Sequence, residues 1–218
     1  MRRIHLLVEG QTEEAIANNI LIPYLESPST WLSVSVLASS RQPGGAKVRG
    51  GVATWARIRR DVVGLLRDTS IDLLTTMIDY YGVPVDTPGM ETRPNGDPLR
   101  RVRHVEQAMA GAVPAGGRFV PHLTLHETEA WIFAGGRALG EHRADAGLGD
   151  RIVKMAADAG GPELLNDGLP TAPSKRLVRL CPDYNKILDG VAVLQRAGLD
   201  TIFAQCPHAA EWIASLRA

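Results

Sequence analysis

The feature that most constrains the fold is a short apolar segment, Arg3–Val8, followed directly by Glu9 and Gly10. A continuous apolar run of this length, with Ile and Val in it, predicts a strand buried on both faces. Gly10 breaks the run. Thr12 and Glu13 then predict a helix start, because a hydroxyl and an acidic side chain suit the N–H groups left open there. The first strand should therefore deliver the Glu9 carboxylate to the edge of a sheet.

Strand and helix patterns alternate along the first 135 residues. Further strands are expected at 31–37, 73–78 and 119–125, and helices at 12–25, 53–67, 99–111 and 127–134. This alternation favours right-handed crossover connections between parallel strands. We therefore predict an α/β fold with a mainly parallel sheet flanked by helices.

Beyond residue 135 the sequence changes character. Helical stripes predominate, at 152–157, 174–180, 186–197 and 209–216, and Thr201–Phe203 is too short to assign. The sequence thus predicts two parts: an α/β domain over 1–135, and a helical C-terminal extension over 136–218 packed on it.

Composition limits the environment and the partners. Basic and acidic residues number 24 each, so the net charge is zero and gives no general attraction to nucleic acid or to an anionic membrane. The sequence has no apolar run long enough to span a membrane, and the segment after the N-terminal arginines reads as a strand and not as a signal peptide. Cys181 and Cys206 form no disulfide framework. We expect reduced thiols, a cytoplasmic location and no membrane contact.

Acidic residues follow three of the predicted strands: Glu9, Asp79, and Glu127 with Glu129. The carboxyl ends of parallel strands open on one edge of a sheet, where ligands bind. Carboxylates gathered there suit Mg²⁺ or Mn²⁺, and such ions serve phosphoryl chemistry. The alternative is that these acids are solvated, or cap the following helices.

Glu127 and Glu129 share a face only if the strand continues through them. If a helix starts at Glu127, they diverge by about 200°. We expect Glu127 to lie nearer the site and Glu129 to lie at the helix start.

Basic residues offer two further interpretations. The glycine-rich segment 44–51 could cradle a phosphate, although it lacks the P-loop spacing and reads more simply as a surface loop. The arginines of the predicted helix 53–67 read as a solvated face. Those at the start of the helix 99–111 could form a basic rim near Asp79.

Five motifs in this order resemble the family called "domain of unknown function 4276", over nearly the whole chain. They are Val8-Glu9-Gly10-Gln11-Thr12-Glu13, Ile78-Asp79-Tyr80-Tyr81-Gly82, His126-Glu127-Thr128-Glu129-Ala130-Trp131, Pro173-Ser174-Lys175-Arg176 and Cys206-Pro207-His208. The resemblance implies a Toprim-like fold, related to topoisomerases, primases and OLD-type nucleases. It also implies a bacterial defence or DNA-processing role beside an ATPase partner.

The Toprim pattern has a glutamate after the first strand and an Asp-x-Asp motif after a later one. Glu9 matches the glutamate and Asp79 the first aspartate, whereas Tyr81 stands at the position of the second. The resemblance therefore implies Glu9 and Asp79 as catalytic residues, and Mg²⁺ or Mn²⁺ held by Glu9, Asp79, Glu127 and Glu129.

Under this interpretation the protein hydrolyses phosphodiester bonds in nucleic acid. The phosphate contacts would come from basic residues, namely Arg41, Lys47, Arg49, Lys175 and Arg176. Because Tyr81 removes a potential ligand, a non-catalytic Toprim-like module that docks on the ATPase is the alternative function. Nucleotide hydrolysis would need a base or ribose pocket that the sequence does not identify.

Overall fold

The computed structural model of the chain describes residues 1–37, 54–165 and 172–218. These residues form two compact units. Unit 1 consists of Met1–Glu14 and Glu26–Leu123, and unit 2 of Ala15–Leu25 and Thr124–Ala218. The division differs from the two parts expected from the sequence, because a segment near the N-terminus packs with the C-terminal helices.

The sheet has five strands within the described residues. They are β1 (Arg2–Val8), β2 (Thr30–Val36), β3 (Leu73–Asp79), β4 (Phe119–Val120) and β5 (Leu123–Thr124). The order is β2-β1-β3-β4, and β5 also pairs with β3. The β1–β2, β1–β3 and β3–β4 pairs are all parallel. The predicted α/β class and mainly parallel sheet are confirmed.

The single strand expected at 119–125 is divided into β4 and β5. Pro121 lies between them and has no N–H to donate to a neighbouring strand. The buried Thr76 hydroxyl instead bonds to the backbone of His122, the residue after Pro121. It donates to the His122 carbonyl and accepts from the His122 N–H, each at 2.9 Å. A side chain of β3 thus holds the chain where the strand is interrupted.

The helical segment after β1 contains a wider turn. It runs through α1 (Gln11–Ile16), a π-helical turn η1 (Ala17–Leu21) and α2 (Ile22–Leu25). The Ile22 N–H reaches back to the carbonyl of Ala17. The next residue is Pro23, which cannot donate an N–H and crowds the preceding turn. The π-helical turn is the local distortion with which the helical segment accommodates Pro23.

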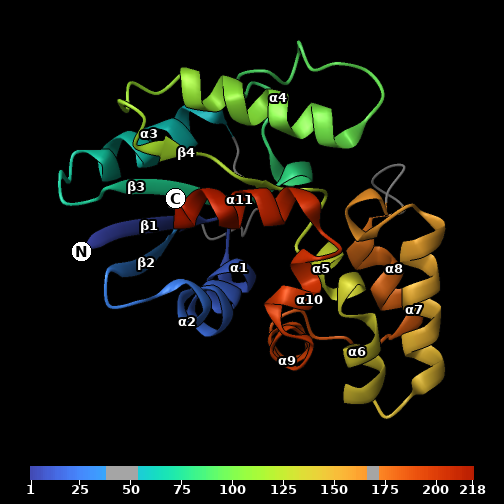
Figure 1. The fold of residues 1–218 in the computed structure, drawn as a ribbon. Helices are drawn as coiled ribbons and strands as arrows, with labels where there is room; N and C mark the ends of the chain where they lie inside the picture. The colour runs from blue at the N-terminus through green and yellow to red at the C-terminus, as the bar shows by residue number, and fades with distance from the viewer. Residues whose placement is uncertain (38–53, 166–171) are drawn as a thin grey trace, which may run out of the picture. The chain divides into compact units, whose positions relative to one another are not determined.

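Helices α3 (Trp55–Leu66) and α4 (Pro98–Gly111) lie on the same side of the sheet (Figure 1). Both bury an apolar stripe at helical spacing, made of Ile58, Val62 and Leu66 in α3 and of Val102, Val105 and Met109 in α4. The Asp97 side chain accepts the Leu99 N–H and starts α4, with Pro98 at its first position. Between β3 and α4 the chain forms a short 3₁₀ turn, η2 (Tyr80–Gly82).

Unit 2 is helical throughout its described C-terminal part. Its elements are α5 (Glu129–Ala134), α6 (Gly136–His142), α7 (Ala146–Asp158), η3 (Pro162–Leu164), α8 (Pro173–Leu180), α9 (Leu188–Ala197), α10 (Leu199–Phe203) and α11 (Pro207–Arg217). Every residue of α5 is buried. Trp131 of α5 contacts the rings of Phe203 and Trp212, with centroids 5.7 and 6.4 Å apart. The expected helical C-terminal part is confirmed, and the unassigned Thr201–Phe203 belongs to α10.

Both cysteines are free thiols and buried. Burial raises the pKa of Cys206 well above its usual value, so its thiol stays protonated. Across the part of the chain that the structure describes, every helix is too short or too polar to cross a bilayer.

Two helical glycines allow a direct test of packing. A Cβ on Gly140 of α6 would lie 2.8 Å from backbone atoms of Gly149 in α7, whereas one on Gly64 of α3 would meet nothing within 4 Å. Alanine is the better helix former at both sites. We therefore expect Gly140→Ala to lower the free energy of unfolding by about 1–3 kcal/mol through overpacking.

Gly64→Ala should raise the free energy of unfolding by about 0.5–1 kcal/mol. Urea unfolding followed by circular dichroism measures both changes. A stabilising Gly140→Ala would contradict the close approach of α6 to α7.

Candidate functional site

The carboxyl ends of β1 and β3 form a topological switch point. These two strands are neighbours, but the chain leaves β1 toward β2 on one side and leaves β3 toward β4 on the other. In open parallel sheets the connections diverge at such a point, and the crevice between them is where ligands bind. Glu9 directly follows β1 and Asp79 ends β3. Sequence reasoning placed both acids at strand ends, and the topology makes those ends adjacent.

A hydrogen bond joins the two positions. The Asp79 N–H donates to Glu9 Oε2 at 3.1 Å, and the Glu9 N–H donates to the Met77 carbonyl at 3.1 Å. The backbone therefore continues the strand pairing while the Glu9 side chain turns toward Asp79. Both acidic residues are half-buried. The arrangement fixes one oxygen of Glu9 and leaves the Asp79 carboxylate at the same edge.

Gly82 completes this edge. A Cβ on Gly82 would lie 2.8 and 2.9 Å from the two carboxylate oxygens of Glu9, closer than such atoms approach. The η2 turn thus folds directly over the Glu9 carboxylate, and only glycine leaves it that room. In the Asp79-Tyr80-Tyr81-Gly82 motif, Asp79 therefore supplies a carboxylate, and Gly82 lets the turn approach Glu9 closely.

Glu13 adds a carboxylate that sequence reasoning treated only as a helix-start residue. It is 7% exposed, and a Cβ on Gly10 would lie 3.4 Å from Glu13 Oε2. The side chain therefore folds back toward the residue next to Glu9. The Glu-Gly-x-x-Glu spacing could have predicted this position of Glu13. An acid in the first helical turn can reach back over the residues that precede the helix.

Two motifs far apart in sequence meet in unit 2. Glu127 Oε2 accepts the Ser174 N–H at 2.9 Å, at the start of α8. Ser174 is followed by Lys175, which is exposed, and Arg176, which is half-exposed. The predicted ligand Glu127 and two predicted phosphate-binding residues thus lie at the beginning of one helix.

His126 precedes Glu127 in a strained backbone conformation. Its φ is +68°, in the left-handed region that non-glycine residues rarely adopt, and the residue is 4% exposed. The turn is closed by the Glu127 N–H, which donates to the Leu125 carbonyl. Such strain persists only where surrounding contacts hold it, and it is common near functional sites.

Glu129 is the most buried of the predicted site residues, at 1% exposure. Its Oε1 lies 2.6 Å from Lys186 Nζ, and its Oε2 has no hydrogen-bond partner among the described residues. Burial raises the pKa of Glu129, and Lys186 opposes that shift only in part. Sequence reasoning missed Lys186, because nothing in the local sequence links it to a residue so far away.

The remaining predicted residues divide between the units. Glu9 and Asp79 lie in unit 1, and Glu127, Glu129, Lys175 and Arg176 lie in unit 2. The predicted phosphate-binding residues Arg41, Lys47 and Arg49 lie outside the described residues. The structure brings Glu9 to Asp79 and Glu127 to the start of α8.

The Cys206-Pro207-His208 motif has a structural explanation. The buried Glu163 carboxylate accepts the N–H groups of His208 and Ala209, both at 3.0 Å, at the first turn of α11. Burial raises the pKa of Glu163, and these two N–H groups lower it in part. The carboxylate supplies the acceptors that a helix start requires.

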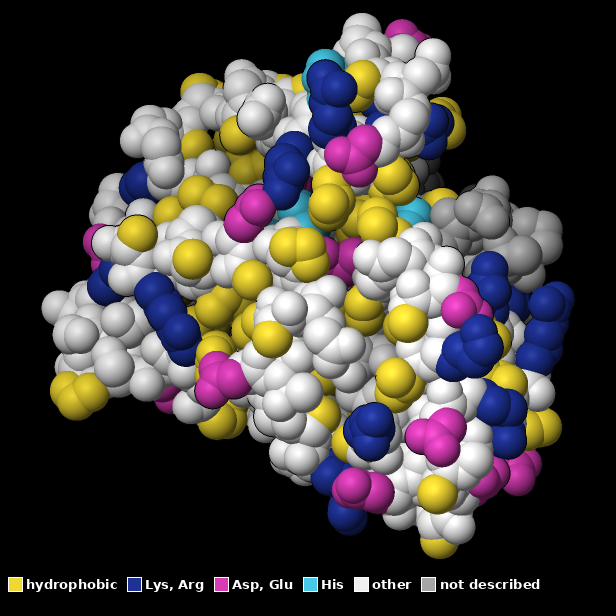
Figure 2. Space-filling model, turned by 45° about the vertical axis from the view of Figure 1, so that its right-hand side comes forward, with side chains coloured by type: hydrophobic (Ala, Val, Ile, Leu, Met, Phe, Trp, Pro, Cys, Tyr) yellow, Lys and Arg dark blue, Asp and Glu magenta, His cyan; other side chains and the backbone are white. Residues whose placement is uncertain are grey.

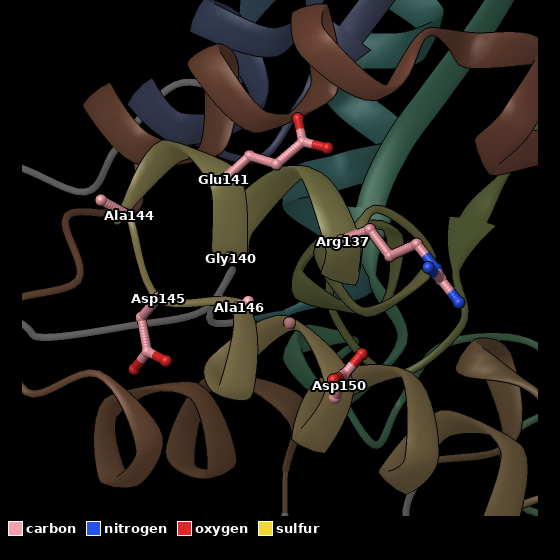
Figure 3. Close-up of a pocket in the computed structure, with 8 residues that line it drawn as sticks. Arg137, Gly140, Glu141, Ala144, Asp145, Ala146 and Asp150 are labelled. Carbon is pink, nitrogen blue, oxygen red and sulfur yellow. The ribbon is translucent and has the colours of Figure 1, made fainter.

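A hollow of about 340 Å³ lies between α6 and α7 (Figure 3). Arg137 and the carboxylates of Glu141, Asp145 and Asp150 line it. In Figure 3 the Glu141 and Asp145 side chains point in different directions, so the acids do not converge on one point. The hollow is therefore not a candidate metal site.

The raised pKa of Glu129 predicts a pH dependence of stability. The folded protein holds this proton at pH values where the unfolded chain releases it. The stabilisation is complete below the ordinary value of 4.5 and is lost as pH rises through the raised pKa. We expect the free energy of unfolding of the unmodified protein to fall, relative to Glu129→Gln, from about pH 4.5 toward neutral pH.

Urea unfolding at closely spaced pH values measures this difference. Glu141→Gln, which alters an exposed carboxyl of the same unit, is the matched control. Parallel pH profiles for Glu129→Gln and the unmodified protein would show that burial of Glu129 has no such effect.

Comparisons with known proteins identify a family. Searches of curated proteins and of solved structures each returned no significant match. A family model described as "Domain of unknown function (DUF4276)" matches residues 8–217. The match takes in Glu9, Asp79 and nearly all of both units, and the chain therefore belongs to this family of unknown function.

Proposed function

We propose that the protein is a Mg²⁺- or Mn²⁺-dependent hydrolase of phosphodiester bonds in nucleic acid, with Glu9 and Asp79 at its centre. The observation that carries the proposal is the position of these two acids. They stand at the carboxyl ends of adjacent parallel strands, at the switch point of the sheet, and the Asp79 N–H bonds to Glu9. Ligand sites of open parallel sheets occur at this place.

The residues present suit a hard divalent cation. Both donors are carboxylates, and they lie at adjacent strand ends, where the Asp79 N–H bonds to Glu9 Oε2. Mg²⁺ requires few carboxylates, because it keeps several of its waters. The Glu9–Asp79 pair can therefore anchor such an ion. Glu13, which folds back beside Gly10, is the nearest further candidate for a carboxylate at this end of β1.

When bound, the ion would neutralise phosphate charge and lower the pKa of a bound water. The chain's own contribution is orientation. The Asp79 N–H bonds to Glu9 Oε2 and so orients this carboxylate at the end of β1. Gly82 keeps the covering turn close to Glu9 without displacing it. The ligand roles predicted for Glu127 and Glu129, and the phosphate contacts predicted for Lys175 and Arg176, stay predictions.

We further propose a Toprim-like relationship. It is supported by a glutamate directly after the first strand and an aspartate at the end of the adjacent parallel strand. A setting in bacterial defence or DNA processing, with an ATPase partner, is part of the same proposal and rests on the sequence resemblance alone.

Tyr81 favours a second candidate function. It stands where the Toprim pattern has another aspartate, and a phenol does not replace a carboxylate as a ligand for Mg²⁺. A Toprim-like module without catalytic activity, docked on the ATPase, would tolerate that loss. Metal binding separates the two functions, because the module has no need of an ion.

The first test removes the two central charges while preserving shape. We expect Glu9→Gln/Asp79→Asn to lose Mn²⁺ binding in calorimetry. Its cleavage of plasmid, single-stranded DNA or RNA should fall by about 10²–10⁴-fold. Glu91→Gln, an exposed acid of the same unit, is the control and should behave as the unmodified protein. Equal cleavage by the double variant would refute the assignment, and absence of Mn²⁺ binding in the folded unmodified protein would favour the module.

Gly82→Ala provides a test that leaves every ligand in place. Its backbone lies outside the left-handed region, so alanine is tolerated there, but the new Cβ must displace the Glu9 carboxylate. We expect Mn²⁺ affinity to fall by about tenfold or more, as when the support of a metal ligand is removed. Thermal unfolding should change little. Gly64→Ala, whose new Cβ would meet no atom within 4 Å, is the matched control. Unchanged Mn²⁺ affinity in Gly82→Ala would show that Glu9 does not bind the metal.

A further inference from the structure

Two helices of unit 1 begin with arginines. Arg57, Arg59 and Arg60 lie within the first six residues of α3, and Arg100, Arg101 and Arg103 lie within the first six of α4. Neither helix has an acidic residue in its first turn or a basic residue in its last. We call these six residues the arginine face.

This pattern is the reverse of the one that stabilises a helix. The N-terminal end of a helix carries partial positive charge and favours acids, and the C-terminal end favours cations. Arg57, Arg100 and Arg101 lie within the first four residues of their helices, where a cation is unfavourable, and Asp97 offsets this at the start of α4. Arginines thus occupy the amino-terminal halves of two helices on the same side of the sheet.

Helices α3 and α4 carry an excess of positive charge. Helices α3 and α4 contain two acids, Asp61 and Glu106, against the six arginines, which leaves an excess of four positive charges. Arg60 and Asp61 are 3.5 Å apart, a weak exposed pair. Glu106 accepts the Leu123 N–H at 2.8 Å and so contributes to the packing around β5.

The arginines are spread along one helix layer. Arg59 Nε lies 3.5 Å from the carbonyl of Ala112, at the end of α4, whereas Arg100 and Arg101 lie at its start. At 1.5 Å per residue, the two groups are separated by about 16 Å along α4. Arg59, Arg60 and Arg100 are exposed. Figure 2 shows Lys and Arg side chains, in dark blue, at the top of the molecule over α4 and the loop before it.

We propose that the arginine face binds the phosphate backbone of double-stranded nucleic acid. Guanidinium groups bind phosphate through paired hydrogen bonds, and separated groups can contact phosphates at different points of a duplex. Proteins that hold single strands stack bases on aromatic rings. Helix α4 has no Phe, Tyr or Trp, and α3 has only Trp55, at its first residue. The inference rests on the proposed function for the choice of nucleic acid, and it specifies the surface and the form of the substrate.

Binding without metal tests the inference apart from catalysis. The probe is a fluorescent DNA duplex of about 20 base pairs in EDTA, titrated with the full chain at several salt concentrations. We expect Arg59→Gln/Arg60→Gln to weaken binding by about tenfold and to reduce the salt slope by between about one and two. Adding Arg100→Gln should reduce both further. Arg151→Gln/Arg196→Gln removes two exposed charges from unit 2 and should leave the slope near that of the unmodified protein.

Helix stability gives a second readout. Arg59 and Arg60 are exposed and lie beyond the first turn of α3, so thermal unfolding of Arg59→Gln/Arg60→Gln should occur at nearly the same temperature. Weaker DNA binding therefore cannot be attributed to loss of fold.

Three results would overturn the inference: a salt slope unchanged in Arg59→Gln/Arg60→Gln, equal loss in the control pair, or tighter binding of a single strand or of anionic vesicles than of the duplex. Duplex binding that depends on the arginine face, without cleavage in Mn²⁺, would refute the proposed hydrolase and leave the inference standing. Cleavage that is unchanged when these arginines are replaced would support the proposed hydrolase and refute the inference.

Discussion

The parallel pairing of β1 with β3 is the interaction on which the rest of the candidate site depends. It runs from Ile4 opposite Leu73 to Val8 opposite Met77. Leu6, Leu7 and Val8 are almost completely buried, and β1 also pairs with β2 on its other edge. A one-residue change of register would exchange the faces of the strand and bury the wrong side chains. The same register that packs the core therefore sets the Asp79 N–H against Glu9.

The core and the ends of the strands were readable from sequence because they follow simple periodicities. The run Arg3–Val8 is confirmed within β1, which is buried on both faces at its carboxyl end, Leu6–Val8. The order β2-β1-β3-β4 was not readable, because no local pattern states which strands are neighbours. The interruption at Pro121 was visible as a residue, but the Thr76 hydroxyl that compensates for it comes from another strand.

The site was predictable in its residue types and less so in its partners. Glu9 and Asp79 were identifiable as acids at strand ends. The closeness of Gly82 to Glu9 was not, because it depends on the η2 turn, and the proline-rich sequence after that turn did not predict it. The pairing of Glu129 with Lys186 joins the first residue of α5 to the turn before α9, which is remote in sequence. Contacts made by tertiary packing alone leave no local pattern in the sequence. The segment Thr201–Phe203 was likewise too short for its helix to be predicted.

Three buried acids of unit 2 differ in how far hydrogen bonds and cations offset the effect of burial on their pKa. Burial would raise the pKa of Asp189, but the Asn185 N–H, His142 and Arg143 hold it below its usual value. Glu163 receives two helix N–H groups, which offset its burial only in part. Glu129 depends on one lysine and keeps an oxygen without a hydrogen bond among the described residues, so it is the least compensated of the three. Poorly compensated acids are more frequent at functional sites than in structural ion pairs.

The assignment of Ala15–Leu25 to unit 2 has a consequence for how the chain is made. These residues emerge from the ribosome early, yet they pack with residues from 124 onward. At typical synthesis rates of about 5–20 residues per second, the apolar stripe of Ile16, Ile20 and Leu21 waits for about 5–20 s before its partners exist. All of unit 1 is synthesised before residue 124, whereas unit 2 cannot complete its packing until the later residues are made. The stripe is therefore exposed on the nascent chain during that interval, and a fragment that ends before residue 124 should leave it unburied.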